Sequence, residues 1–541
     1  MNTSSLPLKS IETLVDSFQG NNAPALSFYQ GRTLVGRTTY SELHQSVLSL
    51  THFLVESLGI ARGDRVLILS ENRLEVPALL LAIFVVGAVA VPLNPTGAPD
   101  DWEFISGHSG ARGIFATSEL RTKFLESGRS LEFALEIEAL APPKKHSTLR
   151  NRSHLDPPDE ISLVLYTSGT TGQPKGVALN QRALLHSAWS MTENFSLKRS
   201  IQLAVLPLYH AHALGFGLMT ALTTRGHLVF MDRFDPFAWS EVINREEVTH
   251  TSVVPTFLPL LLSTRVHQTK VPTLRCLLVS SAPLSTLLAR EFETKTEIRL
   301  VQGWGLSEYT NFACCQSPDE PRALHEKHLF GGESTSVGRP LPGTEVIILG
   351  DDGQLLGEGI TGELCILGPS QMNSYFSDPT ATERTMTNGW LRTGDQGHFI
   401  GGNFYITGRI KEIIIRNGDK ISPVRVENTL LKSLPNFVSR LAVLGFAHRC
   451  FGEEVGAYVD MTSLCEDDLD QLREALQSLP VDQRPKVVIT GRTPLPRTHT
   501  GKVQRRRLLP LFAVFRDFKG PSQILSLPTA LVPLTAPVII L

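Results

Sequence analysis

A run of small, hydroxylated and basic residues between Leu165 and Val177 has the composition of a phosphate-binding loop. The apolar segment Ile161–Tyr166, which has the character of a strand, leads directly into it. Glycines let backbone N–H groups approach an anion, hydroxyl groups add donors, and a lysine adds a positive charge for a polyphosphate. The candidate phosphate-binding residues are therefore Thr167, Ser168, Gly169, Thr170, Thr171, Gly172 and Lys175.

This loop is not a Walker A motif, because Gln173 and Pro174 separate Gly172 from Lys175. An ordinary polar hairpin could contain the same residue types, but it does not require them in this order. The order Tyr-Thr-Ser-Gly-Thr-Thr-Gly-Gln-Pro-Lys-Gly resembles, without a mismatch, the signature of the adenylate-forming superfamily of acyl-CoA synthetases, NRPS adenylation domains and luciferases. Further segments resemble the motifs of this family in the expected order, from about residue 10 to residue 508.

The resemblance implies a nucleotide site. Segments 280–284 and 302–308 resemble the family's adenine-flanking motifs, although Trp304 replaces the usual Tyr, and an indole could also stack on a base. Glu308 and Thr167 would bind Mg²⁺, Asp395 would accept hydrogen bonds from the ribose, and Arg409 would hold ribose or phosphate. Without this context, Glu308 is an ordinary loop acid and Asp395 a turn former. The implied adenine-side residues are Ser281, Ala282, Pro283, Gly303, Trp304, Gly305, Leu306 and Ser307.

Three residues are expected to act in catalysis. Segment 496–508 resembles the family's PRTxxGKxxRxxL motif, in which Lys502 would bridge the attacking carboxylate and the α-phosphate. Lys411 would be the hinge of a mobile domain, and His210 would gate the acyl and thiol tunnels. The spacing after His210 is longer than in the family, so His212 is an alternative for that role. A merely basic surface around Lys502 is disfavoured, because aromatic residues and overall basicity are lacking.

The resemblance implies two half-reactions, with ATP, Mg²⁺ and CoA or a phosphopantetheine carrier as partners. No carboxylate in Tyr209–His212 could pair with an ammonium group, and the candidate pocket wall is largely apolar: Phe216, Val254, Pro255, Thr256 and Phe312. We therefore expect a hydrophobic carboxylic acid as substrate, with a fatty acid favoured over a cinnamate-type aryl acid. The alternatives are an acyl-AMP ligase that loads a carrier protein, a luciferase-like oxygenase, and a non-catalytic nucleotide-binding homologue. Retention of Lys502, Glu308 and Asp395 argues for an enzyme.

Elements that alternate along the chain must position these residues. Short apolar runs alternate with helix-like segments up to about residue 280, which predicts layered α/β subdomains with parallel strands. Residues 343–407 are rich in glycine and short strands, which predicts a β-rich subdomain. The expected strands are Arg65–Leu69, Gly113–Ala116, Ile161–Tyr166, Leu203–Pro207, His227–Met231, Thr251–Val254, Cys276–Val279, Glu345–Leu349, Gly362–Leu367, Phe404–Ile406, Arg440–Gly445 and Gly456–Met461.

These patterns predict the α/β class, with a large N-terminal domain and a small α+β domain near the C-terminus, and the resemblance implies that the small domain is mobile. We predict a large AMP-binding domain over 1–408, a hinge over 409–411, a small domain over 412–508, and a C-terminal extension over 509–541 without an assignable structure. The uncharged stretch Val76–Leu93 is long enough to span a membrane, but Gly87 divides it into a predicted buried helix and a buried strand.

Composition sets the remaining limits. Among the 541 residues 42% are hydrophobic and 19% charged, which excludes a disordered chain. The formal charge of −2 gives no reason to expect nucleic acid or an anionic membrane as partner. The six cysteines form no CxxC pair, so neither a structural zinc site nor a disulfide scaffold is expected. With no secretory signal at the N-terminus, the expected location is cytoplasmic.

Overall fold

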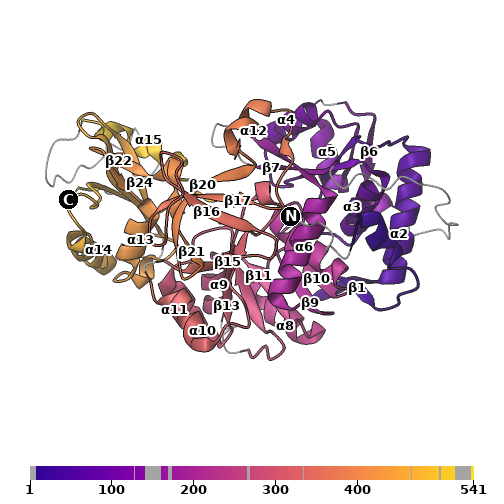
Figure 1. Ribbon diagram of the computed structural model, residues 1–541, viewed down its shortest axis with the longest axis horizontal. Coiled ribbons are helices and arrows are strands. Elements are labelled where there is room, and N and C mark those ends of the chain that lie inside the picture. The colour runs from indigo at the N-terminus through magenta and orange to yellow at the C-terminus, as the bar shows by residue number, and fades with distance from the viewer. Residues whose placement is uncertain are drawn as a thin grey trace.

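The computed structural model contains two large β-sheets and one small sheet, each covered by helices (Figure 1). It describes residues 8–126, 128, 130–140, 160–167, 173–264, 269–332, 334–462, 464, 466–498, 501–517 and 538–540. Ser168, Gly169, Thr170, Thr171 and Gly172 of the predicted phosphate loop lie outside the described residues.

The first sheet carries the strand that leads into the phosphate loop. Its parallel part has the order β7 (Ile161–Thr167), β4 (Val89–Leu93), β3 (Arg65–Leu69), β5 (Gly113–Ala116) and β6 (Phe133–Glu136). The antiparallel strands β8 (Lys175–Asn180) and β18 (Ser374–Tyr375) extend it beyond β7. The helices of this region are α1 (Ile11–Asp16), α2 (Tyr40–His52), α3 (Glu75–Val86), α4 (Pro99–Ser109), α5 (Ser118–Glu126) and α6 (Gln181–Phe195).

The uncharged stretch Val76–Leu93 folds into a helix and a strand that Gly87 separates, as predicted. Helix α3 is buried almost throughout, Gly87 ends it in the left-handed region with φ of +77°, and β4 follows with every residue buried. Such a conformation at the end of a helix favours glycine, which has no Cβ to clash. Within the described residues, no helix combines the length and the apolar character that crossing a membrane requires.

The second sheet joins the α/β region to the β-rich region. Its order is β16, β17, β20, β21, β15, β14, β13, β12, β11, β9, β10, β1 and β2, and the pairs from β13 to β1 along this path are parallel. The bounds are β1 (Pro24–Gln30), β2 (Thr33–Thr39), β9 (Ile201–Ala204), β10 (His227–Met231), β11 (His250–Val253), β12 (Cys276–Val279), β13 (Leu300–Trp304), β14 (Cys314–Cys315), β15 (Ser336–Pro340), β16 (Glu345–Leu349), β17 (Gly362–Leu367), β20 (Trp390–Ile400) and β21 (Asn403–Arg409). The flanking helices are η4 (Ala213–Met219), α7 (Thr220–Thr223), α8 (Pro236–Glu246), α9 (Phe257–Ser263), α10 (Thr286–Thr296), α11 (Arg322–Phe330) and α12 (Pro379–Thr385).

The third sheet forms the small region at the end of the molecule that carries α14 in Figure 1. The chain enters it from β21 through one short turn of helix, η7 (Ile410–Glu412). Its elements are β22 (Ile414–Arg416), β23 (Asp419–Ile421), α13 (Pro423–Leu431), β24 (Leu441–His448), β25 (Gly452–Asp460), α14 (Glu466–Ser478) and β26 (Val487–Gly491). The predicted α/β class, with a β-rich subdomain and a smaller α+β region, is confirmed.

Part of the predicted C-terminal extension belongs to this small region. Helix α15 (Leu509–Phe512) buries Phe512, whose ring lies 5.4 Å from that of Phe446 on β24. Gly456 on β25 makes room for it, because a Cβ there would lie 2.6 Å from the Phe512 ring. Strand β27 (Val538–Ile540) then pairs with β26.

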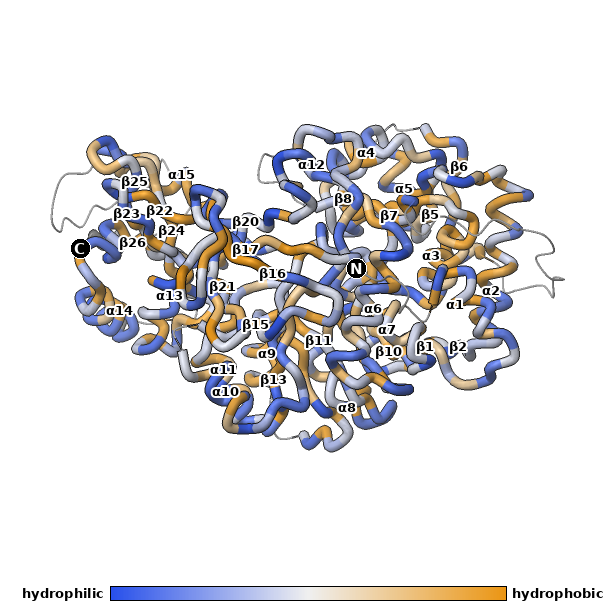
Figure 2. Tube along the Cα trace, in the orientation of Figure 1, coloured by the Kyte–Doolittle hydropathy of each residue, from blue (hydrophilic) through white to orange (hydrophobic). Residues whose placement is uncertain are grey.

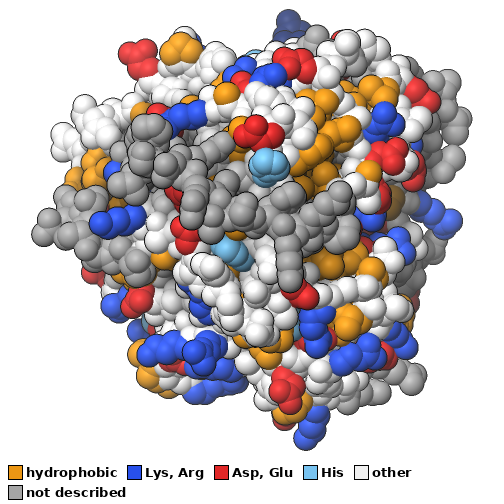
Figure 3. Space-filling model, turned by 90° about the vertical axis from the view of Figure 1, so that its right-hand side faces the viewer, with side chains coloured by type: hydrophobic (Ala, Val, Ile, Leu, Met, Phe, Trp, Pro, Cys, Tyr) orange, Lys and Arg blue, Asp and Glu red, His pale blue; other side chains and the backbone are white. Residues whose placement is uncertain are grey.

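Apolar residues gather along the strands and the inward faces of the helices (Figure 2). The buried residues of the clusters around the two large sheets all come from positions up to 404. Those of the small region all come from 414 onward. The short helix η7 therefore connects two separately packed cores. On the face in Figure 3, positive and negative side chains are interspersed, in keeping with the nearly neutral chain.

Candidate active site

The predicted ribose-binding carboxylate, Asp395, lies in the middle of β20, close to the residues that end β21 and β13. Asp395 on β20 is directly opposite Arg409 on β21, and Arg409 Nε lies 2.8 Å from Asp395 Oδ1. The other oxygen, Oδ2, accepts a hydrogen bond of 2.9 Å from Trp304 Nε1. The attraction of Asp395 raises the pKa of Arg409 above its usual value. Each carboxylate oxygen has one donor and keeps a further lone pair, which suits two ribose hydroxyls.

Two glycines fix Trp304 where β13 ends. A Cβ on Gly305 would lie 1.8 Å from the carbonyl oxygen of Asn311, and one on Gly303 would lie 2.8 Å from the Phe312 ring. Ala313 N–H donates to the Trp304 carbonyl at 2.9 Å. Trp304 was expected to stack on adenine, and its hydrogen bond to Asp395 is a contact that the sequence did not indicate.

Lys502 lies close to this group although it belongs to the small region. Burial, followed by repulsion from Arg409, lowers its pKa to about 8, while the attraction of Asp395 acts in the opposite direction. The preceding Gly501 approaches the large region closely, since a Cβ there would lie 2.7 Å from Thr256 Oγ1. Lys502 therefore lies within electrostatic range of the Asp395–Arg409 pair, at the junction between the two regions.

Arg505 holds the loop that carries Lys502. Its guanidinium pairs with Glu412 at 2.9 Å and with Glu427 at 2.7 Å. The Lys502 N–H donates to Thr498 Oγ1 at 3.1 Å. Since Glu412 lies in η7 beside Lys411, the lysine loop and the predicted hinge share an ion pair. Lys411 itself is exposed.

Tyr375 connects the phosphate side of the site to Glu308. Its hydroxyl donates to Glu308 Oε1 at 2.7 Å, and Lys175 Nζ lies 5.0 Å from the centre of its ring. Burial and the nearby Glu308 carboxylate raise the pKa of Tyr375 far above its usual value, so it remains a donor. Thr167 stands opposite Lys175 in the β7–β8 pair. Sequence reasoning gave Tyr375 no role, because its position depends on the pairing of β18 with β8.

Glu308 provides the kind of ligand that Mg²⁺ uses. Among the described residues, no group of three or more His, Cys, Asp or Glu side chains could hold a metal by itself. Mg²⁺ is commonly held by one or two carboxylates together with substrate phosphates, so a single carboxylate beside a phosphate loop fits this ion. The binding of Mg²⁺ by Glu308 and Thr167 remains a prediction.

The two candidate gating histidines differ in their surroundings. His212, only 7% exposed, lies with Nδ1 3.0 Å from Ser280 Oγ, and burial followed by repulsion from His210 lowers its pKa to about 3. The His210 ring packs against Tyr209 at 4.3 Å. Ser281, on the predicted adenine side, has φ of +73°, a conformation that L residues rarely adopt. His212 is thus joined to the 280–283 segment.

Aromatic rings border His212 on the predicted acid side. Phe312 meets it edge-on at 5.1 Å, and Phe216 lies 6.4 Å from it. Phe216 also contacts Phe195 at 5.4 Å, and all three phenylalanines are buried. Phe216 lies in η4, a π-helix, an element often found at functional sites. His212 therefore adds a buried, neutral imidazole to the predicted apolar wall.

Comparison with known proteins identifies the chain. The family model for AMP-binding enzymes matches residues 17–376. The chain belongs to the AMP-binding enzyme family. It is 33% identical over 462 residues to a sulfoacetate–CoA ligase of Cupriavidus necator, covering 83% of this chain and 88% of that protein. An oxalate–CoA ligase of Arabidopsis thaliana is 30% identical, with coverage of 86% and 92%.

Solved structures agree with this family. ATP-bound MatB from Rhodopseudomonas palustris superimposes with a TM-score of 0.80 at 25% identity, covering 93% of this chain and 98% of that one. The o-succinylbenzoate CoA synthetase of Bacillus subtilis, solved with its acyl-adenylate, gives a TM-score of 0.77 at 26% identity, with coverage of 92% and 97%. This AMP-binding enzyme is therefore an adenylate-forming enzyme of the acid–thiol ligase type, as the motifs predicted.

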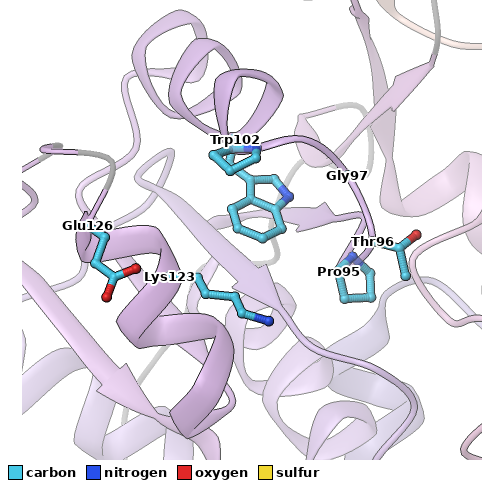
Figure 4. Close-up of a pocket in the computed structure, with 7 residues that line it drawn as sticks. Pro95, Thr96, Gly97, Trp102, Lys123 and Glu126 are labelled. Atoms are coloured by element: carbon cyan, nitrogen blue, oxygen red, sulfur yellow. The ribbon is translucent and has the colours of Figure 1, made fainter.

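One pocket lies apart from this site (Figure 4). It has a volume of about 370 Å³ and lies between α5 and the loop that leads into α4. Lys123 extends below the Trp102 ring there and is paired with Glu119. The lining shares no residue with the nucleotide or acid sites: Pro95, Thr96, Gly97, Pro99, Trp102, Lys123 and Glu126. We assign it no role in the reaction.

Proposed function

We propose that this AMP-binding enzyme activates a carboxylic acid with ATP and transfers the acyl group to the thiol of CoA. The observation that carries the proposal is the position of Lys502, which lies within electrostatic range of the Asp395–Arg409 pair at the junction of the two regions. A protonated lysine there can hold the carboxylate of the acid against the α-phosphate, two anions that otherwise repel each other.

In the first half-reaction, an oxygen of the acid attacks the α-phosphorus of ATP, and pyrophosphate leaves. Asp395 accepts hydrogen bonds from the ribose, Lys175 binds phosphate, and Lys502 neutralises charge between the reactants. Mg²⁺, when bound at Glu308 and Thr167, would neutralise phosphate charge. In the second half-reaction, a thiol attacks the acyl carbon, AMP leaves, and the thiol proton is released.

The small region is proposed to move between these steps, so that Lys502 leaves the reacting centre and a thiol can approach the acyl-AMP. Lys411 in η7 is the proposed hinge. CoA is the proposed acceptor, in line with the CoA ligases among the relatives, and a free-standing phosphopantetheine carrier is the alternative.

For the acid, we propose a hydrophobic carboxylic acid, and the buried ring cluster of Phe195, Phe216 and Phe312 supports this. A fatty acid remains the first choice and a cinnamate-type acid the second. The relatives act on varied acids, including sulfoacetate, oxalate and long-chain fatty acids. A third candidate is a short acid with a polar substituent, because His212 and Ser280 are buried polar groups beside the rings.

Pyrophosphate release over a panel of acids tests the proposal. The panel contains octanoate, palmitate, 4-coumarate, sulfoacetate, oxalate, phenylalanine and leucine, each with and without CoA. Turnover with octanoate or palmitate supports the first choice. Turnover confined to oxalate and sulfoacetate supports the polar candidate. Turnover confined to the two amino acids, or acyl-AMP formation that CoA never consumes, contradicts the proposal.

A further inference from the structure

We propose that Trp304 is a positioning residue, whose indole N–H holds the Asp395 carboxylate in the orientation that receives the ribose hydroxyls. The inference rests on the proposed function only in taking Asp395 as the ribose ligand. It gives the tryptophan a task that a tyrosine or phenylalanine at the same position could not perform through a ring N–H. The bond between Trp304 Nε1 and Asp395 Oδ2, at 2.9 Å, carries the proposal.

This bond is not a contact between neighbouring strands. Trp304 is on β13 and Asp395 is on β20, and β14, β15 and β21 lie between them in the sheet order. Four strand-to-strand steps would separate the two strands by about 19 Å in a flat sheet. The sheet therefore curls between β13 and β20, which brings these two side chains together. Register shifts beside Ser336 in β15 and Gln396 in β20 provide irregularities of the kind that bends strands.

The Asp395 carboxylate can accept more hydrogen bonds than Arg409 alone provides, which leaves room for Trp304 as a second donor. Asp395 has two oxygens, each with room for about two hydrogen bonds, and Arg409 occupies one of these positions on Oδ1. The Arg409 side chain is 40% exposed and is itself predicted to bind ribose or phosphate. Trp304 and Asp395, in contrast, are both buried. Trp304 therefore keeps the carboxylate in place when Arg409 turns toward the nucleotide.

The indole is suited to this task because its nitrogen can only donate. Its backbone is held by the β14 pairing and by the close contacts of Gly303 and Gly305. The edge of the ring thus faces the Asp395 carboxylate, which is taken as the ribose ligand.

The test is nucleotide binding measured by calorimetry on the full chain, with MgCl₂ and without any acid. The ligands are ATP, 2′-deoxyATP and 3′-deoxyATP. The variant Trp304→Phe keeps an aromatic ring and removes the N–H. The matched control is Trp390→Phe, which removes an indole N–H from the first residue of β20, five residues before Asp395. Thermal unfolding of both variants reports any general loss of structure.

We expect Trp304→Phe to raise the Kd for ATP about tenfold, the lower end of the effect of a hydrogen bond to a charged group. The ratio of the variant's Kd to that of the unaltered protein should fall toward one with the deoxy nucleotides, because each lacks a hydroxyl that Asp395 is proposed to bind. It should also fall toward one when the change is made in an Asp395→Ala background. Trp390→Phe should bind all three nucleotides as the unaltered protein does.

An equal loss for ATP and both deoxy nucleotides would overturn the proposal, since it would show that Trp304 acts on the base or on the fold. An unchanged Kd in Trp304→Phe would overturn it as well. If the unaltered protein binds ATP but no acid supports pyrophosphate release, only the proposed function fails. If it binds no ATP, both fail.

Discussion

Formation of acyl-AMP should decline as the pH rises through about 8, because Lys502 then loses its proton. Burial and repulsion from Arg409 lower the pKa of this lysine from the usual value near 10.5 to about 8. The lysine acts as a cation, so the active form of the free enzyme predominates below this pKa. About half of the molecules carry the charge at pH 8 and about one tenth at pH 9, and kcat/KM should fall about tenfold for each further pH unit.

The pH dependence of kcat/KM should change when residues that shift the pKa of Lys502 are replaced. Glu412 is not one of the predicted ribose contacts, and its negative charge raises the pKa of Lys502. The variant Glu412→Gln should therefore move the decline in kcat/KM to lower pH. Lys502→Arg keeps its charge throughout this range and should lose the decline, even if its rate is low. At saturating ATP the nucleotide's negative charge favours the protonated lysine, so the decline in kcat should lie at higher pH than the decline in kcat/KM.

The assay is pyrophosphate release at limiting ATP from pH 6 to 10, with hydroxylamine as acyl acceptor so that thiol ionisation plays no part. Unfolding measured at each pH separates titration from loss of structure. A decline at the same pH in Lys502→Arg as in the unaltered enzyme would show that another group titrates, and the assignment to Lys502 would then be refuted.

Three further outcomes follow from the site. Lys502→Ala should abolish acyl-AMP formation but spare thioester formation from supplied acyl-AMP, and an equal loss in both assays would contradict the division of roles. Asp395→Ala should raise the KM for ATP by one to two orders of magnitude, since a hydrogen bond to a charged group contributes about 1.5–3 kcal/mol, and an unchanged KM would remove Asp395 from the ribose. Tyr375→Phe deletes the donor to Glu308, so more Mg²⁺ should be needed for half-maximal rate, whereas an unchanged Mg²⁺ titration would show that this bond does not position Glu308.

Local sequence patterns predicted the helices and strands well, but they predicted poorly which side chains of different elements are in contact. The helix and strand around Gly87, and strands such as Cys276–Val279, depend on residues adjacent in sequence and were predicted correctly. The strand expected at Leu203–Pro207 instead spans Ile201–Ala204 and ends before Pro207, because proline cannot donate to a strand ladder.

No sequence pattern indicated the side-chain contacts that depend on how the strands curve and pair. The bond from Trp304 to Asp395 requires the sheet to curl, and Tyr375 reaches Glu308 through a short strand pairing. The motifs pointed to individual candidate residues, but they could not say which atoms would meet. They also left residues 509–517 unassigned, because the burial of Phe512 depends on a space left by Gly456.

The division of the interior into two cores on either side of η7 has a mechanical consequence. The large and small regions each keep their buried residues to themselves, so the small region can turn as a rigid body without unpacking its interior. Such a turn would break the exposed pair of Lys420 and Asp351, a kind of pair that contributes only about 0–1 kcal/mol, and would also draw Gly501 and Lys502 away from the large region. A reorientation of this type needs no local unfolding, so its rate should be set by a few backbone torsions near Lys411 and by whichever ligand occupies the junction.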